Sequence, residues 1–338
     1  LMLVAHWVVR KFATGADATL LPLAALLHGI GFVMITRLDD ELAGLQSVWS
    51  LLGVAVFCVV LIVVQRATDL ARYRWLLFFA GAAGLLLPLV PGLGANINGA
   101  RIWVSVGPIN FQPGEFAKIA LAIFFAAYFA DNRELIAAKT WKVGPFHLPE
   151  PRFILPVLLA WGFAVVVMVG QRDLGSSLLF FTLFVVMIWV ATERVGWLLL
   201  GAALFAAAAY YAWTQFTHVQ TRVDIWLDPW ADSLGRGYQI VQSLFGLADG
   251  GITGTGLGRG NPNQVPEAQN DFIFAAIGEE LGLVGGTAIL MAYLLIVGAG
   301  LRTALRTERT FEKLLAVGLT TIIGVQAFII IGGVVKLV

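Results

Sequence analysis

A carboxylate at the edge of a long apolar stretch is the first feature of this sequence that suggests chemistry. Asp271 ends a polar segment and is followed at once by Phe272 and Ile273. A carboxylate at the rim of an apolar surface is partly desolvated, which disfavours its charged form and makes it a better base. Capping of a helix N-terminus explains the same position equally well. Both interpretations of Asp271 stay open on this evidence.

Other ionisable groups enter the apolar stretches, where each one costs roughly 2.5–3.5 kcal/mol on insertion scales. Glu115 and Lys118 are three residues apart, so they share a helix face and can pair. This pair either orients the helix or positions a polar ligand. Asp173 opens an apolar stretch at a place where a carboxylate caps a helix and meets its dipole. Glu279 and Glu280, about two turns beyond Asp271, are expected to have a structural role.

Arginines and glycines mark the polar loops. Because a guanidinium binds phosphate oxygens through two hydrogen bonds, loop arginines are candidates for holding a phosphorylated ligand, although each one alone is an ordinary loop residue. These candidates are Arg101, Arg222, Arg236 and Arg259. The run GGITGTGLGRG fits neither the dinucleotide-binding nor the P-loop pattern, so turns and close backbone approach are its expected role. The histidines have no metal-ligand spacing, and the single Cys58 makes no internal disulfide.

The elements that must position these residues are membrane-spanning helices. Hydrophobic residues make up 59% of the 338-residue chain and charged residues 13%, with a mean hydropathy of +0.84. A soluble domain carries about 25% charged residues, so a soluble enzyme is excluded. The net charge of +1 gives no basic field for nucleic acid. Stretches of helix-spanning length are expected at about 19–37, 46–64, 75–93, 114–130, 153–170, 174–192, 195–213, 271–300 and 313–334.

Lys and Arg predict the orientation of these spans. With the first full span running outward, the inner segments carry about twice as many Lys and Arg as the outer ones, which favours this orientation. The outer loops are then 94–112 and 214–270, and the second is too aromatic and apolar to be a disordered linker. We expect it to be structured. Residues 1–338 are expected to form one membrane domain, a fragment at both ends that opens on a short apolar stub.

Six motifs in order along the chain resemble a known family. They are NGARIW, FQPGEFAK, QRDLGSS, GYQIVQSL, GTGLG and PEAQNDFIFAAIGEELGLVG. The sequence is similar over about residues 19–338 to the SEDS family of RodA, FtsW and their relatives, and most similar to its actinobacterial RodA branch. The resemblance implies an all-α, polytopic bundle of transmembrane helices with a large extracytoplasmic loop.

The resemblance also implies a peptidoglycan glycosyltransferase that polymerises lipid II at the outer face of the bacterial cytoplasmic membrane, in cell elongation. Asp271 matches the family's essential aspartate and is the expected base for the GlcNAc 4-hydroxyl, with undecaprenyl diphosphate leaving. A class B penicillin-binding protein is the implied partner, and a divalent cation, Mg or Mn, is a possible cofactor. The expected substrate-binding residues are Arg101, Glu115, Lys118, Asp173, Arg222, Gln239, Ser243 and Glu267.

The sequence departs from the family pattern at three places. The family's His-Thr-Asp is here Gln269-Asn270-Asp271, and its Pro-Ser-Glu is Pro113-Gly114-Glu115. The last family helix, which forms a wall of the cavity, is not in the sequence, so activity of this chain as given is left open.

Two other functions compete with the polymerase. A lipid II flippase would place ionisable groups near the bilayer midplane and show repeats or broken helices. A non-catalytic scaffold for cell-wall synthases would function equally well with Asp271→Asn. The polar motifs gather at the outer rim and no repeat is seen, which favours the enzyme.

Overall fold

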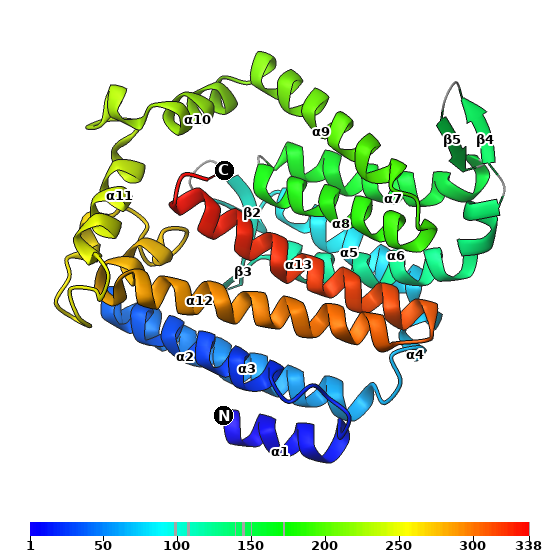
Figure 1. Cartoon of the computed structure of the whole chain (residues 1–338), viewed down its shortest axis with the longest axis horizontal. Helices are drawn as coiled ribbons and strands as arrows, with labels where there is room; N and C mark the ends of the chain where they lie inside the picture. Colours follow the sequence, from blue (N-terminus) through cyan, green and yellow to red (C-terminus); the bar gives the residue numbers. More distant parts are fainter. Residues whose placement is uncertain are drawn as a thin grey trace. The chain divides into compact units, whose positions relative to one another are not determined.

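The chain is almost entirely helical, as expected (Figure 1). The computed structural model describes residues 1–97, 100–106, 109–138, 140–143, 146–149, 151–171 and 173–337. Along the chain the elements are α1 (Met2–Phe12), α2 (Leu20–Leu38), α3 (Asp40–Val63), α4 (Asp69–Arg72), α5 (Arg74–Leu86), η1 (Leu87–Leu89), β1 (Gly94–Ile97), β2 (Ala100–Val106), β3 (Ile109–Phe111), α6 (Pro113–Ala138), β4 (Thr140–Val143), β5 (Phe146–Pro149), α7 (Pro151–Gly170), α8 (Leu174–Thr192), α9 (Gly196–Gln215), α10 (Thr217–Leu227), η2 (Pro229–Asp232), α11 (Tyr238–Gly250), η3 (Pro262–Gln264), α12 (Ile273–Arg306) and α13 (Thr310–Val334).

Within the described ranges, eight helices are long and apolar enough to cross a membrane. The sequence predicted nine spans. The expected span 75–93 is instead the shorter α5, with 13 residues, continued by the three-residue η1. Leu87-Pro88 falls at this junction, and proline removes a helical hydrogen-bond donor, which accounts for the change from α-helix to 3-10 helix.

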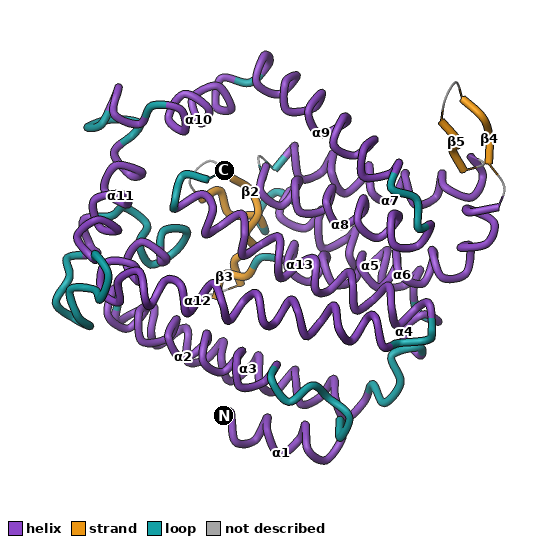
Figure 2. Tube along the Cα trace, viewed as in Figure 1, coloured by secondary structure: helices purple, strands orange, loops and turns teal. Residues whose placement is uncertain are grey.

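The loop 94–112 contains a small antiparallel sheet that the sequence analysis did not predict (Figure 2). Its strand order is β1-β2-β3, with Gly94 opposite Val104 and Val104 opposite Phe111. The signal was present in RIWVSV, where polar or aromatic residues alternate with β-branched ones at the period of a strand. The 214–270 loop holds α10, η2, α11 and η3, as its composition indicated.

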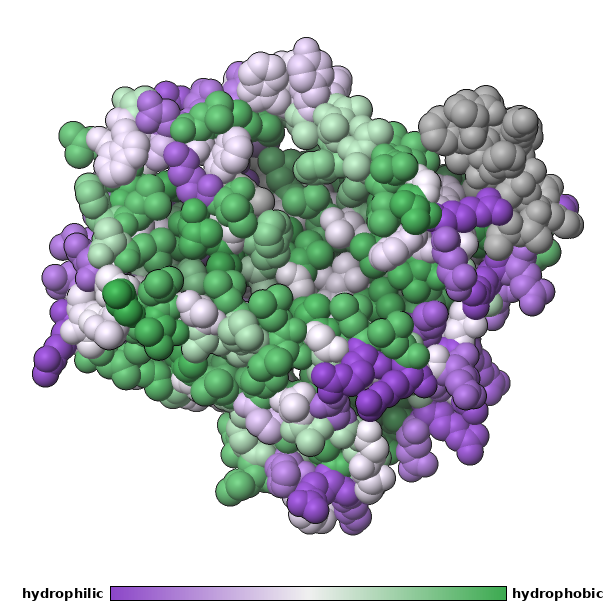
Figure 3. Space-filling view, in the orientation of Figure 1, coloured by the Kyte–Doolittle hydropathy of each residue, from purple (hydrophilic) through white to green (hydrophobic). Residues whose placement is uncertain are grey.

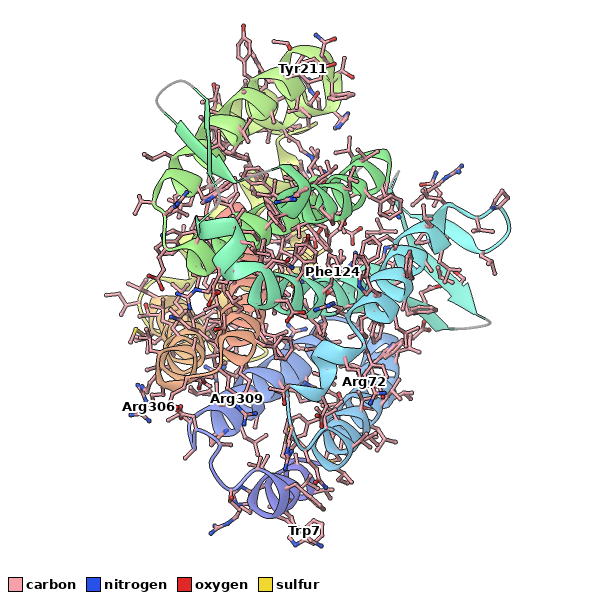
Figure 4. All side chains as sticks on the ribbon, turned by 90° about the vertical axis from the view of Figure 1, so that its right-hand side faces the viewer. Trp7, Arg72, Phe124, Tyr211, Arg306 and Arg309 are labelled. Atoms are coloured by element: carbon pink, nitrogen blue, oxygen red, sulfur yellow. The ribbon has the colours of Figure 1, made fainter. Side chains whose placement is uncertain are left out.

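The chain divides into two compact units. Unit 1 comprises 1–65, 205–299 and 326–338, and unit 2 comprises 66–204 and 300–325. The core of unit 1 gathers buried residues of α2, α12 and α13, including Met34, Phe274 and Ile331. In unit 2, Phe124 lies among neighbouring helices and its ring contacts those of Trp75 and Phe78 (Figure 4).

Much of the surface is hydrophobic, as a lipid-facing surface must be (Figure 3). On α9, Leu199 and Tyr211 are 68% and 62% exposed. Tyr211 also projects outward in the side-chain view (Figure 4). In water such a surface would promote aggregation, whereas in a bilayer it is the side expected to face lipid.

Helix α12 is broken at Gly282, although the sequence predicted one continuous span over 271–300. Gly282 has φ 66° and ψ −168°, a conformation that is essentially restricted to glycine. The glycine-rich segment 250–260, which we call the glycine loop, lies against the break. Its Gly251 and Ile252 carbonyls accept from the amides of Leu283 (2.9 Å) and Val284 (3.1 Å). The loop thereby replaces hydrogen bonds that the helix loses at the break.

Candidate functional site

Asp271 lies in a tight turn immediately before α12. The Glu267 carbonyl closes this turn by accepting from the amides of Asn270 (3.0 Å) and Phe272 (3.2 Å). The Asp271 side chain is exposed. Among the residues that the structure describes, no hydrogen bond links its carboxylate to an amide of the first turn of α12, so the geometry of a helix cap is not formed here. The carboxylate is therefore available to a substrate.

Two of the expected substrate-binding residues hold this turn in unit 1. Gln239, on α11, donates through Nε2 to the Pro266 carbonyl at 3.0 Å. Glu267 adopts φ 56° and accepts through Oε2 from the Asn270 side chain at 2.6 Å. Gln239 and Glu267 thus stabilise the turn that carries Asp271 through these hydrogen bonds.

The other two unit 1 candidates are differently placed. Ser243, on α11, is fully buried, and its hydroxyl donates to the Val334 carbonyl at 3.2 Å. This bond ties α11 to the end of α13, so the structure gives Ser243 a packing role. Arg222 is exposed on α10, where its guanidinium can meet a ligand.

The remaining candidates belong to unit 2. Lys118 is only 3% exposed and lies 2.6 Å from Glu115 Oε2, so the ion pair expected from their spacing is present. Asp173 caps α8 by accepting from the Ser176 amide at 2.9 Å, as its position predicted. Arg101, on β2, is exposed, and its backbone amide donates to the Gln171 carbonyl at 3.4 Å.

A small pocket connects these unit 2 elements. It is lined by residues from α5, η1, β2 and the chain around the start of α6, the end of α7 and the start of α8, namely Leu85, Pro88, Ile102, Gln112, Gly114, Met168, Gln171, Asp173 and Ser176. Gln171 is buried and donates through Nε2 to the Leu85 carbonyl at 2.6 Å. The sequence analysis missed Gln171, because nothing in its spacing separates it from a polar residue at the end of a span.

The structure offers little for a protein-held metal ion. Within the described part of the chain, no group of three His, Cys, Asp or Glu side chains is placed to hold one. The divalent cation stays a prediction from the resemblance, and no role below depends on it.

Comparison with known proteins decides the family. The FtsW/RodA/SpoVE family model, described as "Cell cycle protein", matches residues 18–338. The chain belongs to this family. It is 47% identical to the peptidoglycan glycosyltransferase RodA of Mycobacterium tuberculosis, over 99% of this chain and 74% of that protein. It is 31% identical to a probable peptidoglycan glycosyltransferase FtsW of a Geobacter species, over 93% and 86%.

Solved structures of the FtsW/RodA/SpoVE family share the fold. A chain from a structure described as "Structural coordination of polymerization and crosslinking by a peptidoglycan synthase complex" matches with a TM-score of 0.77 and 27% identity, over 95% of this chain and 87% of that one. Thermus thermophilus RodA matches with a TM-score of 0.65 and 25% identity, over 94% and 85%. The protein is thus a multi-pass membrane protein and a peptidoglycan glycosyltransferase, as the motifs indicated.

Proposed function

We propose that this glycosyltransferase polymerises lipid II with Asp271 as its general base. Asp271 removes the proton from the GlcNAc 4-hydroxyl of one lipid II molecule. The resulting oxygen nucleophile attacks the anomeric carbon of a second molecule, and the bond from that carbon to undecaprenyl diphosphate breaks. An α-linked donor gives a β-linked product, so one inverting displacement accounts for the stereochemistry. A base of this kind contributes typically about 10²–10⁴-fold to the rate.

The observation that carries the proposal is the free-standing carboxylate of Asp271 on a turn that its neighbours hold in place. Protein atoms do not cover this side chain, so protein burial alone does not supply the desolvation expected at this position. A bound lipid headgroup would exclude water and supply that desolvation. As the family resemblance implies, we expect Arg101 or Lys118 to stabilise the departing diphosphate.

Partner and location follow from the same proposal. The solved structure with the TM-score of 0.77 comes from a peptidoglycan synthase complex that couples polymerisation and crosslinking. We therefore propose that this chain works with a crosslinking class B penicillin-binding protein, with its active site at the outer face of the bacterial cytoplasmic membrane. The excess of Lys and Arg on the opposite loops supports that orientation.

The transporter alternative gains one observation from the structure, because a broken helix is a feature that it predicted. In unit 1, however, the protein's own glycine loop lies against the break, through the amides of Leu283 and Val284. A break filled by protein does not offer a path for a substrate.

Glycan polymerisation from purified lipid II by the protein with its penicillin-binding partner tests the proposal. Wild type should make long strands, and Asp271→Asn should make none while folding normally. Asp249→Asn, an exposed aspartate at the end of α11, is the matched control and should polymerise as wild type does. Equal polymerisation by Asp271→Asn would remove Asp271 as the base. Movement of lipid II across vesicles without polymerisation would favour the transporter.

A further inference from the structure

Two adjacent carboxylates on the first segment of α12 bind the glycine loop. Glu279 accepts through Oε1 from the Asn261 amide at 2.5 Å. Glu280 accepts through Oε2 from the Gly258 amide at 3.0 Å. Their backbone carbonyls also accept, from the amides of Thr255 and Gly256, each at 3.0 Å. Two consecutive residues therefore bind three amides of the glycine loop and the amide of Asn261, which directly follows it.

A cation from α2 completes this network. The Arg37 guanidinium lies 3.4 Å from Glu280 Oε1 and donates through Nη2 to the Gly260 carbonyl at 3.2 Å. The Glu280 side chain is fully buried, whereas that of Arg37 is 33% exposed. Arg37 thus forms an ion pair with the carboxylate and a hydrogen bond to the loop that the carboxylate binds. The sequence analysis singled out neither Arg37 nor this pairing.

The loop can approach this closely only because of its glycines. At Gly254, which has φ +83°, an added Cβ would lie 2.2 Å from the Glu280 carbonyl oxygen. The network and the break at Gly282 therefore form one assembly, in which the loop is fixed to both sides of the break.

We propose that Glu280, Arg37 and Glu279 are positioning residues for the glycosyl transfer. They fix the short segment of α12 that precedes the break, and Asp271 lies directly before that segment. This inference rests on the proposed role of Asp271. Since a misplacement of about 1 Å can lower a rate by about 10²-fold, a loosened segment should lower kcat much more than it changes KM.

Substitution of Arg37 and substitution of Glu280 should lower kcat by different amounts. Arg37→Met leaves a fully buried carboxylate without its cation, which is the more damaging way to break a buried pair. We expect kcat to fall by roughly 10–100-fold with KM within about two-fold. Glu280→Gln keeps the side-chain shape and an acceptor for the Gly258 amide, and the one-third-exposed Arg37 can be partly hydrated, so this variant should lower kcat less than Arg37→Met does.

The double variant Arg37→Met/Glu280→Gln gives the discriminating measurement. It removes the unpaired charge, so it should recover at least about five-fold of the kcat lost in Arg37→Met. Glu308→Gln, an exposed glutamate after α12, is the matched control and should have wild-type kcat. All rates are expressed per folded protein, measured as the monodisperse fraction after size exclusion.

Hydrogen exchange of the full chain in lipid nanodiscs tests, independently of activity, whether Arg37 and Glu280 fix the glycine loop. Arg37→Met should exchange faster than wild type over residues 251–261, and the double variant should be intermediate. Unchanged exchange there would overturn the inference, and so would faster exchange with an unchanged kcat. An active Asp271→Asn variant would overturn the general-base proposal alone, because the exchange and rescue measurements do not involve Asp271.

Discussion

Substitution of Gly282 by alanine should damage the protein far more than its small size suggests. An added Cβ at this position would lie 2.2 Å from the Gly254 amide nitrogen and 2.6 Å from the Ile252 carbonyl oxygen. Neither atom belongs to a flexible side chain, so the glycine loop itself must move. The φ of 66° adds a backbone penalty of about 1–3 kcal/mol for any residue other than glycine.

The size of the effect follows from these terms. Displacing the loop breaks its hydrogen bonds to Leu283 and Val284, each worth about 0.5–1.5 kcal/mol. Together with the backbone penalty, the loss of stability is about 2–6 kcal/mol. At about 2 °C per kcal/mol, the apparent unfolding midpoint should fall by roughly 4–12 °C.

Thermal unfolding of the purified protein, followed by tryptophan fluorescence, measures this fall. The matched control is Gly298→Ala in the same helix, where an added Cβ meets no atom within 4 Å. Since alanine favours a helix over glycine by about 0.8–1 kcal/mol, the control should melt at or slightly above the wild-type midpoint. A Gly282→Ala midpoint equal to that of wild type, or a control that is equally damaged, would refute the structural reasoning.

Asp173 and Asp232 give two further predictions. Asp173→Ala should lose about 1 kcal/mol of stability with the cap of α8, whereas Asp173→Asn should keep the cap, so a loss of polymerisation in the asparagine variant alone would show that the charge is needed. The backbone amide of Arg236, and then its side chain, hold the pKa of the Asp232 carboxyl below its ordinary value. Its contribution to stability is therefore complete above the unfolded-state pKa of about 3.9 and is lost as the pH falls through the lower, folded-state value. Hydrogen exchange of the 232–236 turn, corrected for its intrinsic pH dependence, should accelerate only under those acidic conditions, and Asp232→Asn should show fast exchange already at pH 7.

Local residue patterns predicted most of the membrane-spanning helices and two contacts correctly. The three-residue spacing of Glu115 and Lys118 gave their ion pair, and the position of Asp173 before an apolar stretch gave the cap of α8. Each of these depends on residues within one turn of helix, so sequence periodicity is sufficient.

The break in α12 could not be predicted in the same way. The sequence around Gly282 was interpreted as one continuous span despite Glu279 and Glu280, and the break depends on carbonyls of Gly251 and Ile252 about 30 residues earlier. Likewise, nothing in the sequence pairs Arg37 with Glu280, since the two are brought together only by the packing of α2 against α12 in unit 1. What the Asp271 carboxylate does chemically stays a prediction, because its role depends on a bound substrate.

The break in α12 also sets the depth at which its carboxylates meet the bilayer. Beyond Gly282, 24 of its 34 residues remain. At about 1.5 Å per residue they extend about 36 Å, more than the roughly 30 Å of hydrocarbon that a span must cross. The segment before the break is therefore not needed to cross the membrane. Glu279 and Glu280 can therefore lie at the headgroup boundary, outside the hydrocarbon, where the loop amides and the Arg37 guanidinium lower the cost of their charge.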